Sequence, residues 1–345
     1  MLLAGPGLRA DDAPVRGPRA RGDVRVARVV LDAYVTDDSG EAIPDLTASD
    51  FRVRAGRKDV EIESVEWIPA GKSEGPVDAV EGSGAIEGVD AAPSSAAGAP
   101  SVRYPPGRVL VFFIQADIGR YRAKGLMRVR SEIHRLLDTL VPTDRAAVVR
   151  FDSHLTLLCD FTSNRAVLDA AFHEGLLQGT EPLIVPSPFP SLAAGLDAEE
   201  ARRAPHVERA LDLVSRALIP IPGGKALVFL GWGFGIDRAP REGADMARAF
   251  ASMAAARINV FTLDVSDADW HTLETTLQDT SALTGGTYQK THLFAATAVT
   301  RLAKSLAGRY VLVCVAPDSG VADELHVTLR AQRGEVLSRG YTFAP

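Results

Sequence analysis

From residue 108 onward, short apolar runs alternate with segments of helical periodicity, and this alternation limits the folds open to the chain. The runs RVLVFFI, KALVFLG and INVFTLDV are continuous enough for strands that are buried on both faces. After the first run, apolar residues recur at helical spacing, at Leu126, Val129, Ile133, Leu136, Leu137 and Leu140. Parallel neighbours need a crossover connection, so we expect a doubly wound, mostly parallel α/β sheet with helices on both faces.

One pair of strands departs from this pattern. The runs AAVVRF and LTLLCDF are separated only by Asp152, Ser153 and His154, and so short a connection joins antiparallel strands. We therefore expect one antiparallel edge strand in an α/β domain that spans 107–307. Within this domain, 178–206 is a proline-rich insertion that we expect to rise above the sheet.

The two ends of the chain have the alternating pattern of half-buried strands. Val29, Leu31, Ala33 and Val35 alternate near the N-terminus, and Leu325, Val327 and Leu329 alternate near the C-terminus. Neither set has enough strands to be stable alone. We expect 23–68 and 308–345 to pack together as a small β-sandwich-like module.

Two further segments have a different composition. Residues 69–106 are rich in Gly, Ala, Ser and Pro, which predicts a flexible linker or insertion. Residues 1–22 begin MLLAGPGLRADDAP, which resembles the tail of a secretory signal. This leaves two alternatives, a remnant signal segment in an exported protein (periplasmic or extracellular) or a disordered N-terminus in a cytoplasmic one.

Composition excludes several classes of partner. The chain has 345 residues and a formal net charge of −6, which argues against nucleic acid or an anionic membrane as the main partner. It has no apolar run of about 18 residues, so we expect no transmembrane segment. Cys159 and Cys314 each lie in an apolar run, and we expect two buried free thiols, with one disulfide as the alternative.

Several motifs together resemble the von Willebrand factor type A (vWA) domain. They are the strand, loop and helix from residue 108, the hairpin region TDRAAVVRFDSHLTLLCDFTSNRAVLDAAF and the strand KALVFLGWG. More narrowly, the chain is similar to bacterial vWA-related proteins of the kind often seen in Acidobacteria. That similarity extends to VVLDAYVTDDSGEAIPDLTASDFRV near the N-terminus, to TSALTGGTYQ and to the closing SRGYTFAP.

The resemblance implies a metal-ion-dependent adhesion site above the carboxyl ends of the strands, built from a D-x-S-x-S loop, a threonine and a later aspartate. If Gln115 takes the place of the leading aspartate, Asp117 and Gly119 stand where the two serines belong. If the motif starts at Asp117 instead, Gly119 and Tyr121 stand there, so neither register gives the motif. A second loop keeps Asp160, Thr162 and Ser163, but Trp232 replaces the later acid before Gly233. Magnesium prefers several oxygen ligands in near-octahedral geometry. We therefore expect a degenerate site with vestigial ligand positions at Asp117 and Thr162, and no cofactor.

The glycines of GWGFG do not indicate a nucleotide site. Their third glycine comes one place too early for a dinucleotide fingerprint, with Ile236 at the required position, and the lysine of a phosphate-binding loop is absent. The histidines show no paired metal-ligand spacing, and no nucleophile motif occurs. We interpret Asp267, Asp269 and Trp270 as the N-cap region of a helix, with the rim of a site as the alternative.

These observations favour a non-catalytic protein-binding or scaffolding module that needs no metal. The alternatives are a magnesium-dependent adhesion module with a non-standard ligand set and, third, a hydrolytic enzyme. For Trp232 two hypotheses stay open, an exposed aromatic anchor for a partner protein and a side chain that fills the vacant metal pocket. The residues expected at the partner-binding face are Gln115, Asp117, Gly119, Tyr121, Asp160, Thr162, Ser163, Trp232, Gly233 and Asp237.

Overall fold

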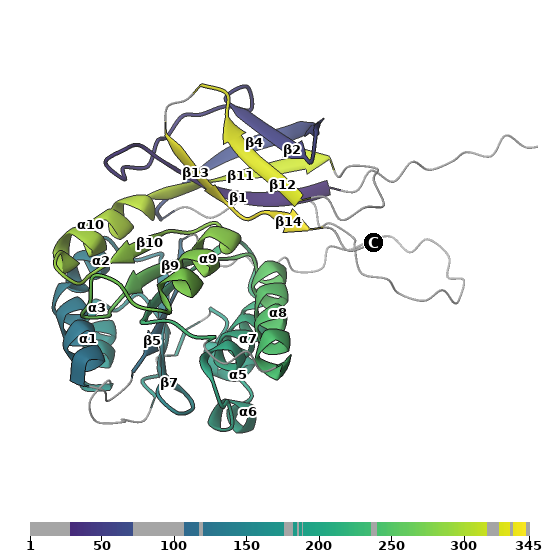
Figure 1. Ribbon diagram of the computed structural model, residues 1–345. Coiled ribbons are helices and arrows are strands. Elements are labelled where there is room, and N and C mark those ends of the chain that lie inside the picture. Colours follow the sequence, from purple (N-terminus) through teal and green to yellow (C-terminus); the bar gives the residue numbers. More distant parts are fainter. Residues whose placement is uncertain are drawn as a thin grey trace, which may run out of the picture.

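The computed structural model describes residues 28–71, 107–116, 120–175, 182–184, 186–187, 189–235, 240–315, 324–331 and 334–342. These residues form an α/β domain and a β-sandwich that packs against it (Figure 1). The segment 1–22 and nearly all of the segment 69–106 lie outside the described residues. None of the helices in the described part is long and apolar enough to cross a membrane.

The α/β domain is built on a six-stranded sheet in the order β10-β9-β8-β5-β6-β7. Its strands are parallel except β7, which pairs antiparallel with β6 at the edge. The expected fold class, including the antiparallel edge strand, is confirmed. The strands are β5 (Val109–Gln115), β6 (Arg145–Phe151), β7 (Leu155–Thr162), β8 (Lys225–Gly231), β9 (Ile258–Asp264) and β10 (Tyr288–Lys290).

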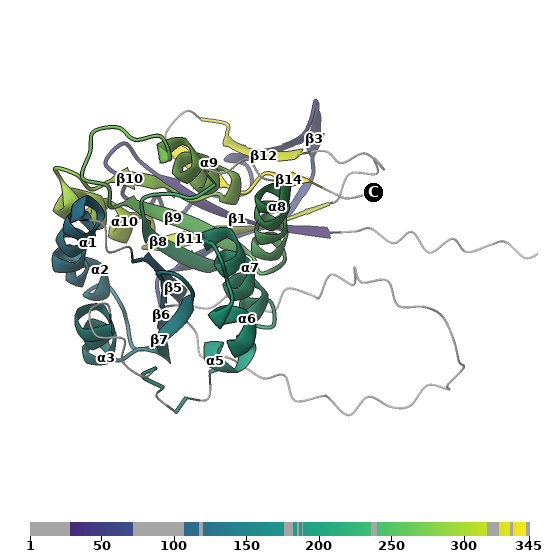
Figure 2. The ribbon, with the colours of Figure 1, turned by 60° about the horizontal axis from the view of Figure 1, so that its bottom comes forward.

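Helices cover both faces of this sheet because β5 is apolar on both sides (Figure 2). Leu110, Phe112 and Ile114 face the cluster formed with α1 (Arg120–Glu132), α2 (His134–Leu137), α3 (Arg165–Ala170), the π-helix η1 (Ala171–Gly175) and α10 (Ala295–Ser305). Val109, Val111 and Phe113 face the cluster formed with α5 (Leu192–Gly195), α6 (Ala198–Arg202), α7 (Val207–Leu218), α8 (Pro240–Ala255) and α9 (Glu274–Thr284).

The β-sandwich joins the two ends of the chain, seen as purple and yellow strands lying side by side (Figure 1). One sheet has the order β13-β1-β11-β4 and the other the order β14-β12-β2-β3. An apolar core fills the space between them. The strands are β1 (Arg28–Thr36), β2 (Phe51–Ala55), β3 (Lys58–Val60), β4 (Ile62–Pro69), β11 (Gly308–Val315), β12 (Glu324–Leu329), β13 (Glu335–Ser338) and β14 (Tyr341–Thr342).

Strand β1 connects the sandwich to the α/β domain because both of its faces are buried. Its odd-numbered residues from 29 to 35 belong to the sandwich core. On the other face, Tyr34 packs edge-on against Phe261 of β9, with ring centroids 4.9 Å apart. Next to it, Asp32 accepts hydrogen bonds from Arg257 at 2.8 and 3.0 Å and from Arg309 at 3.1 Å. A buried carboxylate therefore ties the two parts together.

The closing motif SRGY makes a second tie. Arg339 follows β13 and is only 9% exposed. Its guanidinium donates to the backbone carbonyls of Ile258 at 2.5 Å and Phe250 at 3.4 Å. The C-terminal strands are thereby anchored at the amino end of β9.

The proline-rich segment differs from the expectation of an excursion above the sheet. Phe189, Leu192 and Ala201 are buried in the core beneath α7, so α5 and α6 lie against one face of the sheet. The apolar side chains among the prolines explain this packing, because each buries surface that an excursion would expose. Among the described residues of this segment, Pro205 and His206 at its end reach the pocket described next.

Candidate functional site

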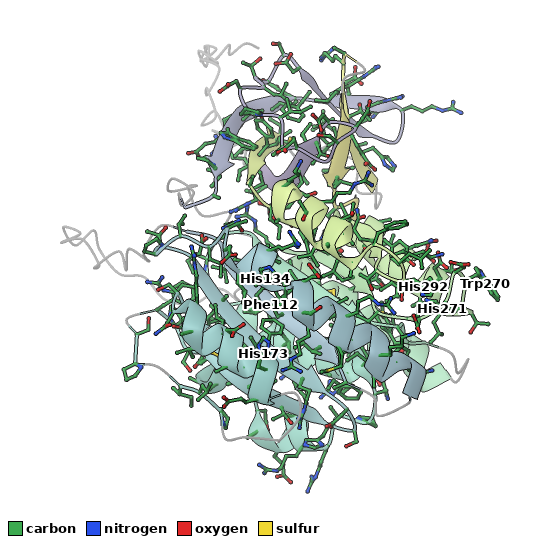
Figure 3. The ribbon with its side chains drawn as sticks, turned by 90° about the vertical axis from the view of Figure 1, so that its left-hand side faces the viewer. Phe112, His134, His173, Trp270, His271 and His292 are labelled. Carbon is green, nitrogen blue, oxygen red and sulfur yellow. The ribbon has the colours of Figure 1, made fainter. Side chains whose placement is uncertain are left out.

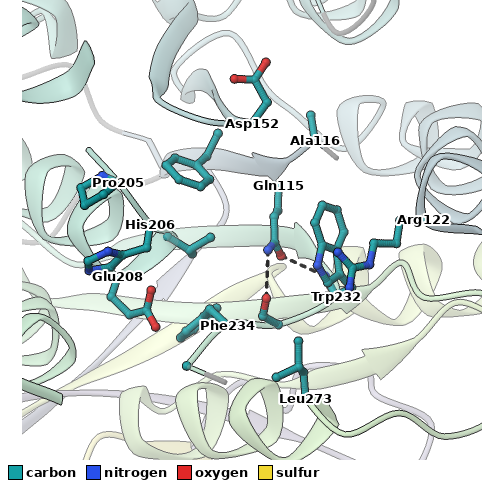
Figure 4. A pocket seen from close by; sticks show the side chains of 14 residues that line it. Gln115, Ala116, Arg122, Asp152, Pro205, His206, Glu208, Trp232, Phe234 and Leu273 are labelled. Atoms are coloured by element: carbon teal, nitrogen blue, oxygen red, sulfur yellow. Dashed lines mark hydrogen bonds between the residues drawn. The ribbon is translucent and has the colours of Figure 1, made fainter. Parts of the chain in front are cut away.

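A cavity of about 420 Å³ opens at the carboxyl ends of β5, β6 and β8 (Figure 4). Open α/β sheets bind ligands at this edge because the loops that leave the strands converge there. The cavity brings together residues from five stretches of the described chain, which are Gln115, Ala116 and Arg122; Phe151 and Asp152; Pro205 to Glu208; Trp232 to Gly235; and Leu273.

Gln115, the last residue of β5, joins two of these stretches. Its Nε2 donates to the carbonyl of Gly233 at 2.9 Å, and its Oε1 accepts from the backbone N–H of Trp232 at 3.1 Å (Figure 4). Gln115 is buried, with 6% of its surface exposed. We call this pair of hydrogen bonds the amide clip, because it holds the loop after β8 against the end of β5.

The glycines of GWGFG make the amide clip possible. A Cβ on Gly231 would lie 2.5 Å from the Gln115 Oε1, and one on Gly233 would lie 2.5 Å from the Leu273 Cβ. Gly233 also has a φ of 109°, which a residue with a side chain rarely adopts. These two glycines therefore allow close approach of the backbone, which is a different role from cradling a phosphate.

Trp232 is 7% exposed, so it is not the exposed anchor of the first hypothesis. Its indole belongs to the apolar cluster on the α1 side of the sheet. The Arg122 guanidinium lies over the indole, 4.7 Å from its centroid, a cation–π contact. The second hypothesis is the one that agrees with this geometry, because the indole fills space at the wall of the cavity.

The wall opposite Trp232 carries acidic and imidazole groups (Figure 4). Glu208, the second residue of α7, is 3% exposed. His206 shares a hydrogen bond of 2.7 Å with Asp245. Burial raises the pKa of Asp245, but hydrogen bonds from His206 and Arg248 outweigh burial, so the pKa lies below its ordinary value. This carboxylate is therefore charged at neutral pH and orients the imidazole at the cavity.

The structure does not bring Asp160, Thr162 and Ser163 to the cavity. Strand β7 runs antiparallel to β6, so Thr162 pairs with Ala146, whereas Gln115 pairs with Phe151 at the other end of β6. Five residues of strand separate the two ends, about 17 Å. The expectation that these residues lie beside Gln115 is wrong for this reason.

Asp160 has a structural role instead. Its carboxylate accepts hydrogen bonds from the Ser191 hydroxyl at 2.5 Å and from the backbone N–H of Leu192 at 2.8 Å. The Phe161 N–H donates to it at 2.7 Å. Because the donors at Ser191 and Leu192 stand at the start of α5, Asp160 fixes that helix to the edge strand.

Three expected site residues, Asp117, Gly119 and Asp237, lie outside the described residues, as does the side chain of Tyr121. Gln115, Trp232 and Gly233 are the expected residues that the structure places at the cavity. Sequence reasoning missed Arg122, Asp152 and Glu208. The one signal for Asp152 was its position in the short turn between β6 and β7, which returns the chain at the carboxyl edge.

The described residues at the cavity do not fit a magnesium ion. The amide of Gln115 is engaged with backbone on both of its polar atoms, Trp232 offers no oxygen ligand, and Thr162 is at the far end of the sheet. Across the described part of the chain, no group of three or more His, Cys, Asp or Glu side chains is arranged to hold a metal ion.

A polar network borders the same sheet edge at β9 and β10. Asp264 accepts from the Tyr288 hydroxyl at 2.6 Å and lies 2.8 Å from the His271 Nε2. Burial, and then the hydrogen bond to Asp264, raise the pKa of Tyr288. Figure 3 shows His271 and His292 together with Trp270 at this edge, far from His134 and His173.

Asp267 links this edge to α1 and is not part of a helix N-cap. Helix α9 begins at Glu274 and has Leu273 at its N-cap position, so the N-cap interpretation of 267–270 is wrong. Asp267 instead pairs with Arg128 at 2.5 Å, Lys124 at 2.9 Å and His292 at 3.0 Å. Hydrogen bonds from Lys124 and Arg128 lower its pKa.

Both cysteines are free and buried, as expected. Cys159 lies in β7 and Cys314 in β11, so they belong to different sheets. Burial raises the pKa of each thiol to about 12. Both thiols are therefore protonated at neutral pH and are poor nucleophiles.

No protein-family model and no curated protein matches this chain. Among solved structures, a von Willebrand factor type A protein from Catenulispora acidiphila is 13% identical (TM-score 0.43) over 88% of this chain and 75% of that one. An aerotolerance-related membrane protein from Bacteroides fragilis is 14% identical (TM-score 0.40) over 58% and 98%. A manganese-loaded TRAP protein from Plasmodium vivax is 11% identical (TM-score 0.38) over 68% and 93%.

The mostly parallel sheet with antiparallel β7 at one edge is what the alternation of strands and helices and the short turn predicted. The central domain has the doubly wound, mostly parallel α/β architecture that was expected. At the cavity of this domain, the amide clip joins the end of β5 to the loop after β8.

Proposed function

We propose that this chain is a non-catalytic module that binds a partner protein in the cavity at the carboxyl ends of β5, β6 and β8. The observation that carries the proposal is a preformed cavity with apolar walls and a few converging polar groups. Phe151, Phe234 and Leu273 supply apolar surface, while Arg122, His206 and Glu208 supply polar groups. Such a combination suits one or two side chains of a partner.

Binding is proposed to need no metal ion. In a metal-dependent site the cation would hold the loops after β5 and β8 in position. Here the amide clip between Gln115 and the backbone of Trp232 and Gly233 already holds them. The geometry of the cavity is therefore supported by neutral hydrogen bonds, which a chelator does not remove.

The absence of catalysis is proposed on the state of the nucleophile candidates. The two thiols are buried, protonated and in strands outside the cavity. His206 faces the cavity, but its partner is Asp245, and the described lining residues include no hydroxyl or thiol nucleophile. Export of the protein stays an expectation that depends on 1–22.

The test compares partner capture by two bulky substitutions. Ala116→Trp places an indole in the mouth of the cavity, whereas Ala166→Trp places one on an exposed position of α3, at the other end of the sheet. Immobilised wild-type protein and both variants are incubated with an extract of the source cells, and the captured proteins are quantified by mass spectrometry. We expect the wild type and Ala166→Trp to capture the same partner proteins. We expect Ala116→Trp to lose them.

Equal capture by all three proteins would contradict the proposed site. Circular dichroism and thermal unfolding of each variant establish that it is folded before capture is compared. If Ala116→Trp does not fold, Ala116→Leu serves as the smaller obstruction.

A further inference from the structure

We infer that the cavity takes a basic side chain, lysine or arginine, from the partner protein. This inference rests on the proposed function and adds the chemistry of the group that is recognised. It follows from the placement of carboxylates and aromatic rings around the cavity and from the charge of the whole chain.

Glu208 is the first reason. It lies at the second position of α7 and is 3% exposed, so its carboxylate already stands at the positive end of that helix. A negatively charged partner group at this wall would meet a like charge. A positively charged group would instead form a charge-assisted hydrogen bond, which is shorter and stronger than a neutral one.

Asp152 is the second reason. It lies in the turn between β6 and β7 at the mouth of the cavity, where its side chain is 29% exposed. Arg150 lies 3.3 Å from one carboxylate oxygen, and the other oxygen lies 3.5 Å from His154 and accepts the Ser153 N–H at 2.7 Å, so these groups balance part of its charge. With Glu208, Asp152 gives the cavity two carboxylates, while the one guanidinium among the described lining residues, that of Arg122, lies over Trp232 on the opposite wall (Figure 4).

The aromatic walls are the third reason. Phe234 and Trp232 are 5% and 7% exposed and both line the cavity, so the stem of a long basic side chain would be covered by apolar surface. The contact of Arg122 with Trp232 demonstrates that a guanidinium fits against the indole in this environment. An arginine or lysine matches both the apolar walls and the carboxylates.

The whole chain supports the same polarity. Its formal net charge of −6 attracts basic partners over distances longer than any single contact. The direct contacts then determine which side chain enters the cavity.

The experiment uses small probes, since the partner is unidentified. The blocked amino acids N-acetyl-lysine-N-methylamide, its arginine counterpart, its glutamate counterpart and its norleucine counterpart are each titrated into ¹⁵N-labelled protein. The indole N–H signals of the three tryptophans are followed, and Trp232→Phe assigns the signal of interest. Trp67, in the sandwich, and Trp270, on an exposed loop, are internal controls.

We expect the lysine and arginine probes to shift the Trp232 signal at millimolar concentration while the glutamate and norleucine probes leave it unchanged. Glu208→Gln keeps the shape of the side chain and removes its charge. It should lower the affinity for the lysine probe by about tenfold. Asp279→Asn removes an exposed charge on α9, outside the cavity lining, and should change nothing. If Glu208→Gln does not fold, Asp152→Asn replaces it and should lower the affinity for the lysine probe by a smaller factor.

The inference is overturned if the glutamate probe shifts the Trp232 signal as strongly as lysine does, or if no probe shifts it. It is equally overturned if Glu208→Gln binds lysine like the wild type. The partner capture assay separates this failure from failure of the proposed function. If Ala116→Trp loses the partners and Glu208→Gln keeps them, the hypothesis of a basic side chain is wrong and the proposed site stands. If both variants capture all the partners, the proposed site itself is wrong.

Discussion

At the scale of single residues, the amide of Gln115 has two partners where a carboxylate could have only one. A carboxylate accepts hydrogen bonds and donates none when ionised, whereas an amide does both. Gln115 accepts from the Trp232 N–H and donates to the Gly233 carbonyl. An ionised carboxylate at this position could accept the first of these hydrogen bonds but could not donate the second.

Removal of the amide clip should destabilise the domain. Gln115→Leu leaves a buried N–H and a buried carbonyl without their partner, and each unsatisfied group costs about 1–3 kcal/mol. Urea unfolding should report this loss in the free energy of unfolding.

The control for the amide clip is Gln278→Leu. Gln278 is exposed on α9, and its amide donates to the Glu274 side chain rather than to backbone, so the substitution should change the free energy of unfolding little. Equal free energies of unfolding for Gln115→Leu and the wild type would mean that the amide clip does not stabilise the domain.

Asp267 should make stability depend on pH at the acidic end. Its pKa is lowered from 3.8 by hydrogen bonds from Lys124 and Arg128, so the folded state favours the charged form. The stabilisation is complete above pH 3.8 and declines as the pH falls toward the lowered folded-state pKa. The groups that face Asp267 are Lys124, Arg128 and His292.

The measurement is the difference in melting temperature between the wild type and Asp267→Asn. We expect the wild type to melt higher at pH 7 and the difference to shrink at about pH 3 and below. A difference that stays constant from neutral to strongly acidic pH would show that Asp267 does not act through its charge.

At the scale of elements, the reversal of β7 determines which residues reach the cavity. The short turn in the sequence predicted the antiparallel pairing of β6 and β7, and the structure has it. That pairing also sends the end of β7 to the opposite end of the sheet. The predicted hairpin therefore already implied that Thr162 lies at the end of the sheet opposite Gln115. The comparison with the motif placed Thr162 beside Gln115 instead, and the structure follows the hairpin.

The strands were predictable for a simple reason, and the cavity was not. Continuous apolar runs such as that of β5 identify strands that are buried on both faces. The cavity, by contrast, combines Gln115 with His206 and Glu208, which lie far along the chain, after the elements from α1 to α6. These residues come close together because of the way α7 packs against the sheet. No local sequence pattern predicts that packing.

The attachment of α5 to β7 gives a test at this scale. Asp160→Ala leaves the Ser191 hydroxyl and the Leu192 N–H without an acceptor and should cost about 1–3 kcal/mol of unfolding free energy. Asp160→Asn keeps one acceptor oxygen and should cost less. Amide hydrogen exchange should be faster in α5 of the alanine variant, with the protection of β5 unchanged. Uniform acceleration across the domain would contradict a local role.

At the scale of the whole molecule, the sandwich packs at the end of the sheet away from the cavity. Asp32 reaches Arg257, which directly precedes β9, and Arg339 reaches the first residue of β9. The cavity lies at the carboxyl ends of the strands. The described strands of the sandwich therefore lie away from the edge of the α/β domain that carries the cavity.

The buried ion pairs of Asp32 should matter for the stability of the whole chain. Asp32→Ala leaves Arg309, whose side chain is 9% exposed, without its carboxylate, a change that costs about 3–5 kcal/mol in buried pairs. Calorimetry should show a lower melting temperature for Asp32→Ala than for Asp59→Ala, which breaks an exposed pair with Arg52. Equal melting temperatures would contradict a clamp at this interface.

The measurement that tests the central claim most directly is partner capture by the wild-type protein in the presence of EDTA, of Mg²⁺ and of Mn²⁺. Because the amide clip of Gln115 holds the cavity without a cation, we predict the same partners and the same amounts under all three conditions. Capture that is lost in EDTA and restored by Mg²⁺ would contradict a metal-independent site.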